Sequence, residues 1–270
     1  MYVGGGTPTS LSEEQFERLM AMTEKYLPME QSKEFTVEAG RPDSITEGKL
    51  RSMKIHGVTR ISINPQSMKE HTLELLGRKH TVEEIREKFM LARTLGFDNI
   101  NMDLIAGLPE ETLEDFKETL REVEALKPDS ITVHTLVIKR ASRLRKEQLE
   151  QGGEMREEDA CIEPMQKEAE QFCRVHGYEP YYMYRQKNKA HTTRNTNQEN
   201  VAYAKPGKEC LYNIFIMEEL QSILALGSGG SSKIVFPEEN RMERVENVKS
   251  VDDYIGRIDE MIRRKKESWR

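Results

Sequence analysis

Short apolar runs alternate with amphipathic segments from residue 2 to residue 138, and this alternation constrains the fold more than any other feature. Period-two or β-branched runs predict strands at residues 2–3, 35–37, 60–63, 100–104 and 130–138. Capped amphipathic patterns between them predict helices at residues 12–26, 46–55, 81–96 and 112–128. Strands that alternate with helices over short connections are typical of a parallel sheet with right-handed crossovers.

Both a (β/α) barrel and an open doubly wound sheet satisfy this alternation. Polar residues and glycines follow each predicted strand, where barrel active sites lie, and no GxGxxG follows the first strand. These two observations favour an α/β fold with a partial parallel (β/α) barrel in residues 1–139. Residues 140–270 contain an aromatic-rich strand at 178–184 and an amphipathic helix at 252–266, so we expect a smaller α+β module there.

Composition and charge exclude several classes of protein. The chain has 41 Lys+Arg against 47 Asp+Glu, a net charge of −6, and the charges are mixed along it, which disfavours nucleic-acid binding. No leader pattern follows Met1, and no uncharged stretch is long enough to cross a bilayer. Cys161, Cys173 and Cys210 form no CxxC pair, and the histidines form no HxxxH or HxH pair, so we expect neither a disulfide framework nor a metal site. These features predict a cytoplasmic protein without a membrane or nucleic-acid partner.

Glycines and a carboxylate follow the first two predicted strands. Gly4, Gly5 and Gly6, followed by Thr7, allow backbone N–H groups to approach an anion closely, although a flexible turn would have the same composition. Glu38 ends the second strand, where it would either bind an ammonium or ribose hydroxyls, or lie in solvent. On these residues alone the two interpretations of each position stay open.

The third and fourth strands add three more candidates. Gln66 follows the third strand, and Arg78 lies twelve residues later. Asp103 lies within an otherwise apolar strand, where a carboxylate is costly to bury unless it is paired or meets a ligand. Since the carboxyl ends of barrel strands share one rim, the sequence predicts that Gly5, Glu38, Gln66 and Asp103 lie on the same side of the sheet.

Five motifs occur in an order that resembles a known family. They are GGGTP at 4–8, VEAG at 37–40, ISINPQS at 61–67, LGRKH at 76–80 and DLIAGLPEET at 103–112. Together they resemble the oxygen-independent coproporphyrinogen III oxidases, which are radical S-adenosylmethionine (SAM) enzymes. AKPGKECLYN and ALGSGG in the tail are similar to motifs of the wider family, and YRQKN and FPEEN resemble its coproporphyrinogen dehydrogenase (HemZ-like) branch.

The resemblance implies a SAM site built from these motifs. By position, Gly5, Gly6 and Thr7 would hold the methionine end, and Val137 would contact the adenine through its backbone. The other implied SAM-binding residues are Glu38, Gln66, Arg78 and Asp103. The family's 4Fe-4S cluster is held by a CxxxCxxC loop upstream of GGGTP, and this chain begins at GGGTP. We therefore expect an N-terminally truncated chain that lacks the first barrel strand, the cluster loop and the cluster's cysteine ligands.

The implied activity is the oxidative decarboxylation of coproporphyrinogen III to protoporphyrinogen IX in haem biosynthesis. Its partners would be the porphyrinogen substrate and a reducing electron donor such as a flavodoxin or a ferredoxin. Two alternatives stay open, a haem-binding chaperone of the same family and a non-catalytic remnant.

Overall fold

The computed structural model describes residues 1–136, 159–185 and 199–269, and its central element is a seven-stranded sheet. Five strands run parallel in chain order: β1 (Tyr2–Val3), β2 (Thr36–Gly40), β3 (Arg60–Ile63), β4 (Ile100–Ala106) and β5 (Ser130–Thr135). Two antiparallel strands, β7 (Glu199–Ala204) and β6 (Glu179–Arg185), extend the sheet beyond β5. The parallel part of the sheet is the predicted partial barrel.

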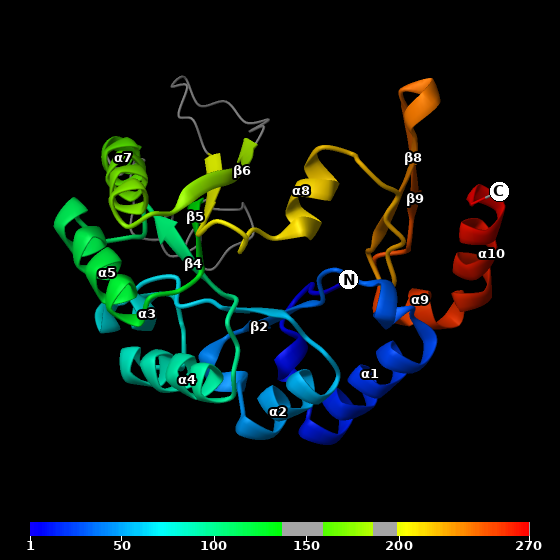
Figure 1. Cartoon of the computed structure of the whole chain (residues 1–270), viewed down its shortest axis with the longest axis horizontal. Helices are drawn as coiled ribbons and strands as arrows, with labels where there is room; N and C mark the ends of the chain where they lie inside the picture. Colours follow the sequence, from blue (N-terminus) through cyan, green and yellow to red (C-terminus); the bar gives the residue numbers. More distant parts are fainter. Residues whose placement is uncertain (137–158, 186–198, 270) are drawn as a thin grey trace, which may run out of the picture. The chain divides into compact units, whose positions relative to one another are not determined.

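Helices follow the parallel strands and lie along one side of the sheet (Figure 1). They are α1 (Glu13–Tyr26), α2 (Glu47–Ile55), α4 (Val82–Thr94), α5 (Leu113–Leu126) and α7 (Asp159–Val175). The predicted capping boxes at Ser12, Thr81 and Thr112 are all formed, so the sequence located these helix starts correctly. The short helix α3 (Glu70–Leu75) follows β3 and was not predicted. Single 3₁₀ turns occupy Pro8–Ser10, Met29–Gln31 and Pro42–Ser44.

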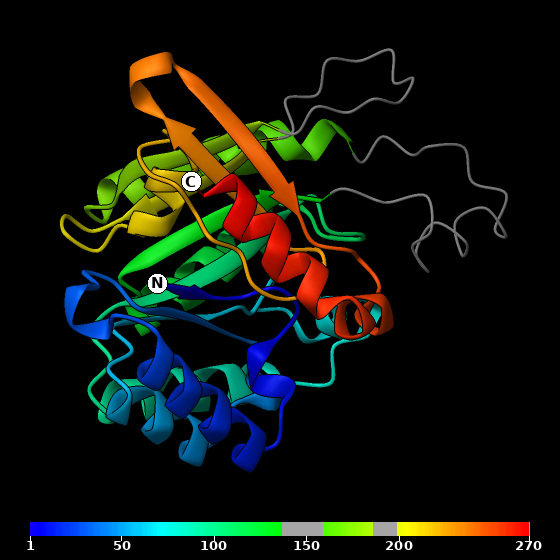
Figure 2. The same ribbon diagram turned by 90° about the vertical axis from the view of Figure 1, so that its right-hand side faces the viewer.

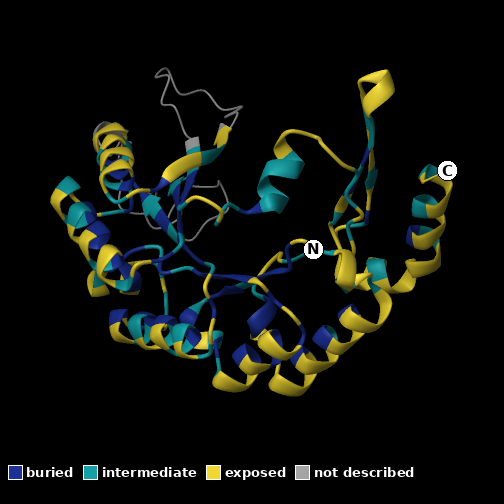
Figure 3. Cartoon of the chain, viewed as in Figure 1, coloured by how far each residue is buried: buried dark blue, intermediate teal, exposed yellow. Residues whose placement is uncertain are grey.

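The two faces of the sheet differ in polarity because side chains alternate along each strand. Val37, Ile61 and Met102 belong to one face and are fully buried in a core with helix residues such as Phe16 and Phe89. Figure 3 shows buried residues along the strands and on the inner sides of the helices. The intervening strand residues form the opposite, polar face.

Contacts between Cα atoms divide the chain into two compact units, Met1–Cys210 and Leu211–Arg270. The strands β6 and β7 belong to the first unit because β7 pairs with β5 in the same sheet. These units differ from the expected division at residues 139/140. The expected division separates the half-barrel shared by the family from a family-specific module, and in that sense it stays a prediction.

The second unit contains a helix, a hairpin and a helix pair. These are α8 (Leu211–Met217), β8 (Ser231–Phe236), a 3₁₀ turn (Pro237–Glu239), β9 (Arg241–Glu246), α9 (Val251–Gly256) and α10 (Ile258–Ser268). Figure 2 shows the β8–β9 hairpin as a long antiparallel pair beside α10. The single helix expected at 252–266 is two helices, since the chain leaves helical geometry at Arg257 after Gly256. Of the helices that the structure describes, none is long and apolar enough to cross a membrane.

Candidate functional site

The polar face of the sheet carries hydrophilic side chains on neighbouring strands. Glu38 on β2 pairs in register with Ser62 on β3, and Ser62 pairs with Asn101 on β4. Asp103 lies two residues beyond Asn101 on the same face, beside Thr132 of β5. The alternation of the strands therefore gathers Glu38 and Asp103 on one face.

The glycine loop after β1 contacts Glu38 directly. The Gly5 N–H donates to Glu38 Oε2 at 3.2 Å, and the Tyr2 hydroxyl donates to Glu38 Oε1. A Cβ at Gly4 would lie 2.5 Å from the Tyr2 ring and 2.8 Å from the Glu38 carboxyl carbon, so a side chain there would force these neighbours to shift. Gly5 and Gly6 have φ of 83° and 73°, which favours glycine at both positions.

Gln66 and Asp103 are adjacent through their backbones. The Gln66 N–H donates to the Asp103 carbonyl at 3.0 Å, and the Ile105 N–H donates to the Gln66 carbonyl at 2.9 Å. Gln66 adopts φ of 70°, an uncommon value for a residue with a side chain. This bridge fixes the point at which the chain leaves β3 relative to β4.

Arg78 follows α3 and lies in a second polar group, with residues of the loop after β2. Its guanidinium is half-buried and forms no hydrogen bond or ion pair with any residue that the structure describes. Burial and the charge of Arg41 lower the pKa of Arg78, against the opposing effect of Asp43. A hollow of about 370 Å³ here is lined by Thr7, Arg41, Asp43 and the neighbouring Lys79, together with Ser10 and Ser44.

Asp103 is the most constrained carboxylate of the polar face. Its Oδ1 accepts a hydrogen bond from the Asn101 amide at 2.6 Å, and its Oδ2 lies 3.7 Å from Nε2 of His134 on β5. Burial alone would raise the pKa of Asp103, but His134 and Asn101 outweigh it and hold that pKa below its usual value. Asp103 is therefore an ionised acceptor, which supplies the pairing that its position in an apolar strand requires.

Gly5 and Gln66 follow the ends of β1 and β3, whereas Asp103 and Glu38, the latter expected at the end of its strand, lie within β4 and β2. Thr7 lines the hollow, as does Lys79, the residue after Arg78. Val137 lies outside the described residues. Sequence reasoning missed Tyr2, Asn101 and His134. Period-two alternation along the strand could have indicated Asn101, which lies two residues before Asp103. Tyr2 and His134 lie on strands that pair with those of Glu38 and Asp103.

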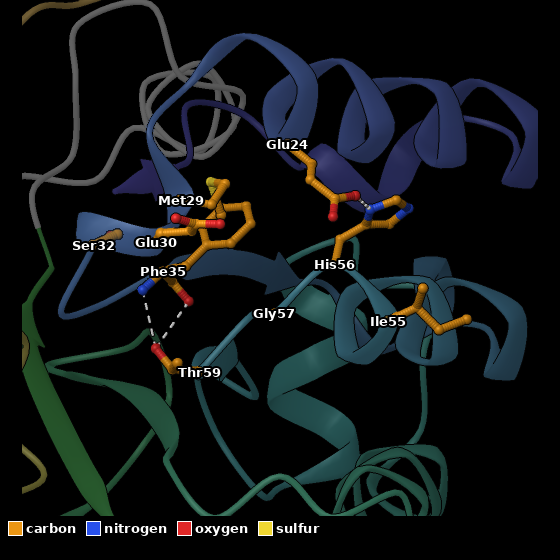
Figure 4. A pocket seen from close by; sticks show the side chains of 9 residues that line it. All are labelled: Glu24, Met29, Glu30, Ser32, Phe35, Ile55, His56, Gly57 and Thr59. Atoms are coloured by element: carbon orange, nitrogen blue, oxygen red, sulfur yellow. Dashed lines mark hydrogen bonds and ion pairs between the residues drawn. The ribbon is translucent and has the colours of Figure 1, made fainter.

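A different hollow, of about 270 Å³, lies at the amino-terminal end of the strands (Figure 4). Phe35 and Thr59, which precede β2 and β3, line it together with His56 at the end of α2. The His56 side chain is 8% exposed and lies 2.9 Å from Glu17 and 2.6 Å from Glu24. None of the predicted site residues lines this hollow, so we assign the site to the opposite end of the strands.

Several known proteins are similar to this chain in sequence or in fold. Residues 1–123 match the family model described as the Radical SAM superfamily. The protein belongs to this superfamily, within its group of oxygen-independent coproporphyrinogen oxidases and their HemZ and HemW relatives. It is 44% identical over 260 residues to the oxygen-independent coproporphyrinogen-III oxidase-like protein HemZ of Bacillus subtilis, an alignment that covers 96% of this chain and 50% of that protein.

Two further relatives define the neighbourhood. The heme chaperone HemW of Bacillus subtilis is 39% identical over 139 residues, which is 51% of this chain and 36% of HemW. The solved coproporphyrinogen III oxidase HemN of Escherichia coli, a radical SAM enzyme, superposes with a TM-score of 0.70 at 22% identity over 96% of this chain and 56% of HemN. That likeness confirms the fold as a radical SAM half-barrel. The chain spans about half the length of these relatives.

The described residues fit one of the family's two cofactors. The Gly5 N–H orients the Glu38 carboxylate, and Glu38 and the ionised Asp103 provide carboxylate acceptors, which suit the ammonium and ribose hydroxyls of SAM. A 4Fe-4S cluster does not fit, since within the described ranges no three His, Cys, Asp or Glu residues are grouped to hold a metal. Cys173 and Cys210 are buried, and burial raises the pKa of the Cys173 thiol to about 12, which disfavours the thiolate that a cluster binds.

Proposed function

We propose that the protein binds SAM on the polar face of its half-barrel and belongs to the machinery that oxidises coproporphyrinogen III to protoporphyrinogen IX without oxygen. The observation that carries the proposal is the hydrogen-bonded unit of Gly5 and Glu38, on the same face as Asp103. The similarity to HemZ over 96% of the chain supports this activity over others of the superfamily. A cytoplasmic location, expected from the cysteine usage, is part of the same proposal.

Each residue has a binding role in this proposal. Gly5, Gly6 and Thr7 hold the methionine end of SAM, and Glu38 accepts from its ammonium group. Asp103 accepts from the ribose hydroxyls, while Gln66 sets the strand end beside it. Arg78, which has no partner among the described residues, binds the carboxylate, because a guanidinium matches a carboxylate bidentately. Val137 contacts the adenine through its backbone.

SAM, together with a cluster that the described residues do not hold, would supply the radical chemistry for hydrogen abstraction from a propionate side chain. The residues of this chain bind and orient SAM and shield it from water. The cluster's thiolates, the porphyrinogen contacts and the reducing partner, such as a flavodoxin or a ferredoxin, complete the proposed system.

Calorimetric titration with S-adenosylhomocysteine tests the SAM site without the cluster. We expect saturable binding that Asp103→Asn and Arg78→Lys each weaken about tenfold, because a charge-assisted hydrogen bond contributes roughly 1.5–3 kcal/mol. Lys69→Arg, an exchange of cations at a surface ion pair with Glu118, is the matched control and should bind normally. Wild-type affinity in both site variants, with lower melting temperatures, would assign the two residues to stability alone.

Haem binding is the second candidate function, since about half of this chain is 39% identical to the corresponding part of HemW, a heme chaperone. Titration with haemin, followed by the Soret absorbance, distinguishes the two. Tight stoichiometric haemin binding together with no affinity for S-adenosylhomocysteine would favour the chaperone.

A further inference from the structure

His134, the next-to-last residue of β5, lies beside polar side chains of two other strands. Its Nε2 lies 3.7 Å from Asp103 Oδ2 on β4, and the side chain of Asn200 on β7 is close enough to the imidazole to raise its pKa. Asn200 Oδ1 accepts the Thr135 N–H at 3.3 Å, which turns the amide oxygen of Asn200 toward β5. A carboxylate and an amide oxygen both favour an imidazole that carries its second proton.

The charges around His134 come from several strands. Burial would lower the pKa of His134, but Asp103 and Asn200 raise it above its usual value. The negative charge of Glu38 on β2 also raises the pKa of His134. The positive charge of Arg60 on β3 lowers the pKa of Asp103. These neighbours therefore favour the protonated imidazole over the neutral form.

A chain of hydrogen bonds fixes Asp103 from its other side. Asn101 Oδ1 accepts from the hydroxyls of Ser130 at 3.0 Å and Thr132 at 3.1 Å. Its amide nitrogen is thereby turned toward Asp103 Oδ1 at 2.6 Å. Arg60 Nη2 donates to Ser130 Oγ at 3.0 Å, which anchors the chain on a guanidinium that is 3% exposed. Only the His134 contact of Asp103 depends on a group that titrates near neutral pH.

We propose that His134 is a positioning residue of the nucleoside site: with Asn101 it fixes the Asp103 carboxylate as an ionised acceptor for ribose hydroxyls, and affinity falls when His134 loses its proton. This inference rests on the proposed function, in which Asp103 binds the nucleoside.

The direction of the pH dependence follows from the groups that face the site. Because the pKa of His134 is raised, its charge is present at low pH and is lost as the pH rises through that value. The pKa of Asp103 is lowered and that of Tyr2 is raised, so neither group titrates between about pH 5.5 and pH 8.5. Nucleoside affinity should therefore be highest at the acid end of this range and decline toward the alkaline end.

The test is calorimetry with S-adenosylhomocysteine on the whole 270-residue chain across that pH range. Wild type should lose about tenfold in affinity from the acid to the alkaline end, the difference between a charge-assisted and a neutral contact. His134→Gln should bind at the wild-type alkaline level throughout, with no slope beyond the ligand's own titration. His176→Gln removes a histidine 3.1 Å from Glu124, away from the site, and should keep the wild-type profile.

A second ligand pair separates positioning from a purely structural role. His134→Gln should weaken adenosine at acid pH and leave 2′,3′-dideoxyadenosine unchanged, because only adenosine offers hydroxyls to Asp103. Equal losses for both nucleosides, or a wild-type pH profile in His134→Gln, would overturn the inference. Wild type that binds no S-adenosylhomocysteine at any pH would instead refute the proposed function, and the inference with it. If His134→Gln fails to fold, His134→Asn takes its place, with the same expected profile.

Discussion

The Tyr2 hydroxyl on β1 donates a hydrogen bond to Glu38 on β2, across the first parallel strand pair of the sheet. Burial, followed by the charge of Glu38, raises the pKa of Tyr2, so the phenol keeps its proton and remains a donor. The Gly5 N–H donates to the other carboxylate oxygen. Both oxygens of Glu38 are therefore oriented by residues that adjoin the glycine loop.

Tyr2→Phe removes one of these donors without changing the shape of the ring. We expect the affinity for S-adenosylhomocysteine to fall about three- to tenfold, because a partly buried carboxylate oxygen loses its partner at a cost of roughly 1–3 kcal/mol. Calorimetry measures the change. Tyr26→Phe alters a tyrosine that is 64% exposed and should bind as wild type does. Equal affinity in Tyr2→Phe and wild type would show that Glu38 needs no orientation from β1.

Gly4→Ala tests the close approach of the loop to Glu38. A Cβ at this position would lie 2.5 Å from the Tyr2 ring and 2.8 Å from the Glu38 carboxyl carbon, so one of the two side chains must move. We expect at least a tenfold loss of S-adenosylhomocysteine affinity. Gly256→Ala adds the same methyl group where nothing lies within 4 Å, and should leave affinity unchanged. Full affinity in Gly4→Ala would place the ligand elsewhere.

The surroundings of His56 make the stability of the fold dependent on pH. Burial would lower the pKa of His56, but its contacts with Glu17 and Glu24 raise it above the usual value. A raised folded-state pKa stabilises the protein fully below the unfolded value of about 6.5, and this contribution is lost as the pH rises through the folded value. The melting temperature of wild type should therefore fall as the pH rises from the unfolded to the folded pKa of His56. The expected fall is roughly 2–4 °C for each kcal/mol of unfolding free energy that is lost.

His56→Gln should remove most of that decline and lower the melting temperature at pH 6. His71→Gln is the matched control, because His71 lies 3.0 Å from Glu110 but both side chains are exposed. Thermal melts of the three proteins at several pH values make the comparison. A slope in His56→Gln as steep as in wild type would assign the pH dependence to other groups, of which His134 is the first to examine.

The 270-residue chain should bind no 4Fe-4S cluster after anaerobic reconstitution. Such clusters need closely spaced thiolates, whereas Cys161, Cys173 and Cys210 are dispersed in sequence and the last two are buried. Iron and sulfide analysis, with absorbance near about 400 nm, measures the outcome. Stoichiometric iron and sulfide would contradict the expectation, and a Cys173→Ser, Cys210→Ser double variant would then show whether these thiols are the ligands.

Local chemistry made much of the half-barrel predictable. The helix starts at Ser12, Thr81 and Thr112 were predictable because each hydroxyl accepts a hydrogen bond from the backbone N–H three residues later. The parallel strands were recognisable because β-branched runs alternate with those helices. Helix α3 has no such signal, since Lys69 at its start offers no side-chain cap.

Long-range pairing was harder to predict than local structure. Nothing near Ala202 in the sequence indicates that β7 joins the sheet at β5, because its partner there, Thr132, is far away in the chain. β6 in turn joins the sheet only through β7. His134 was missed for a related reason. Its partners Asp103 and Asn200 lie on other strands, and only the folded sheet brings them together.

The alternation of the strands limits how this sheet can change by insertion or deletion. Asn101 and Asp103 face the polar side, while Met102 and Leu104 between and after them are fully buried in the core. Removing one residue from β4 would turn every later side chain of the strand to the other face, placing a carboxylate in the apolar core and a leucine on the polar face. Length changes in β4 are therefore tolerable only in pairs of residues, and homologous chains should differ in length within the connecting loops instead.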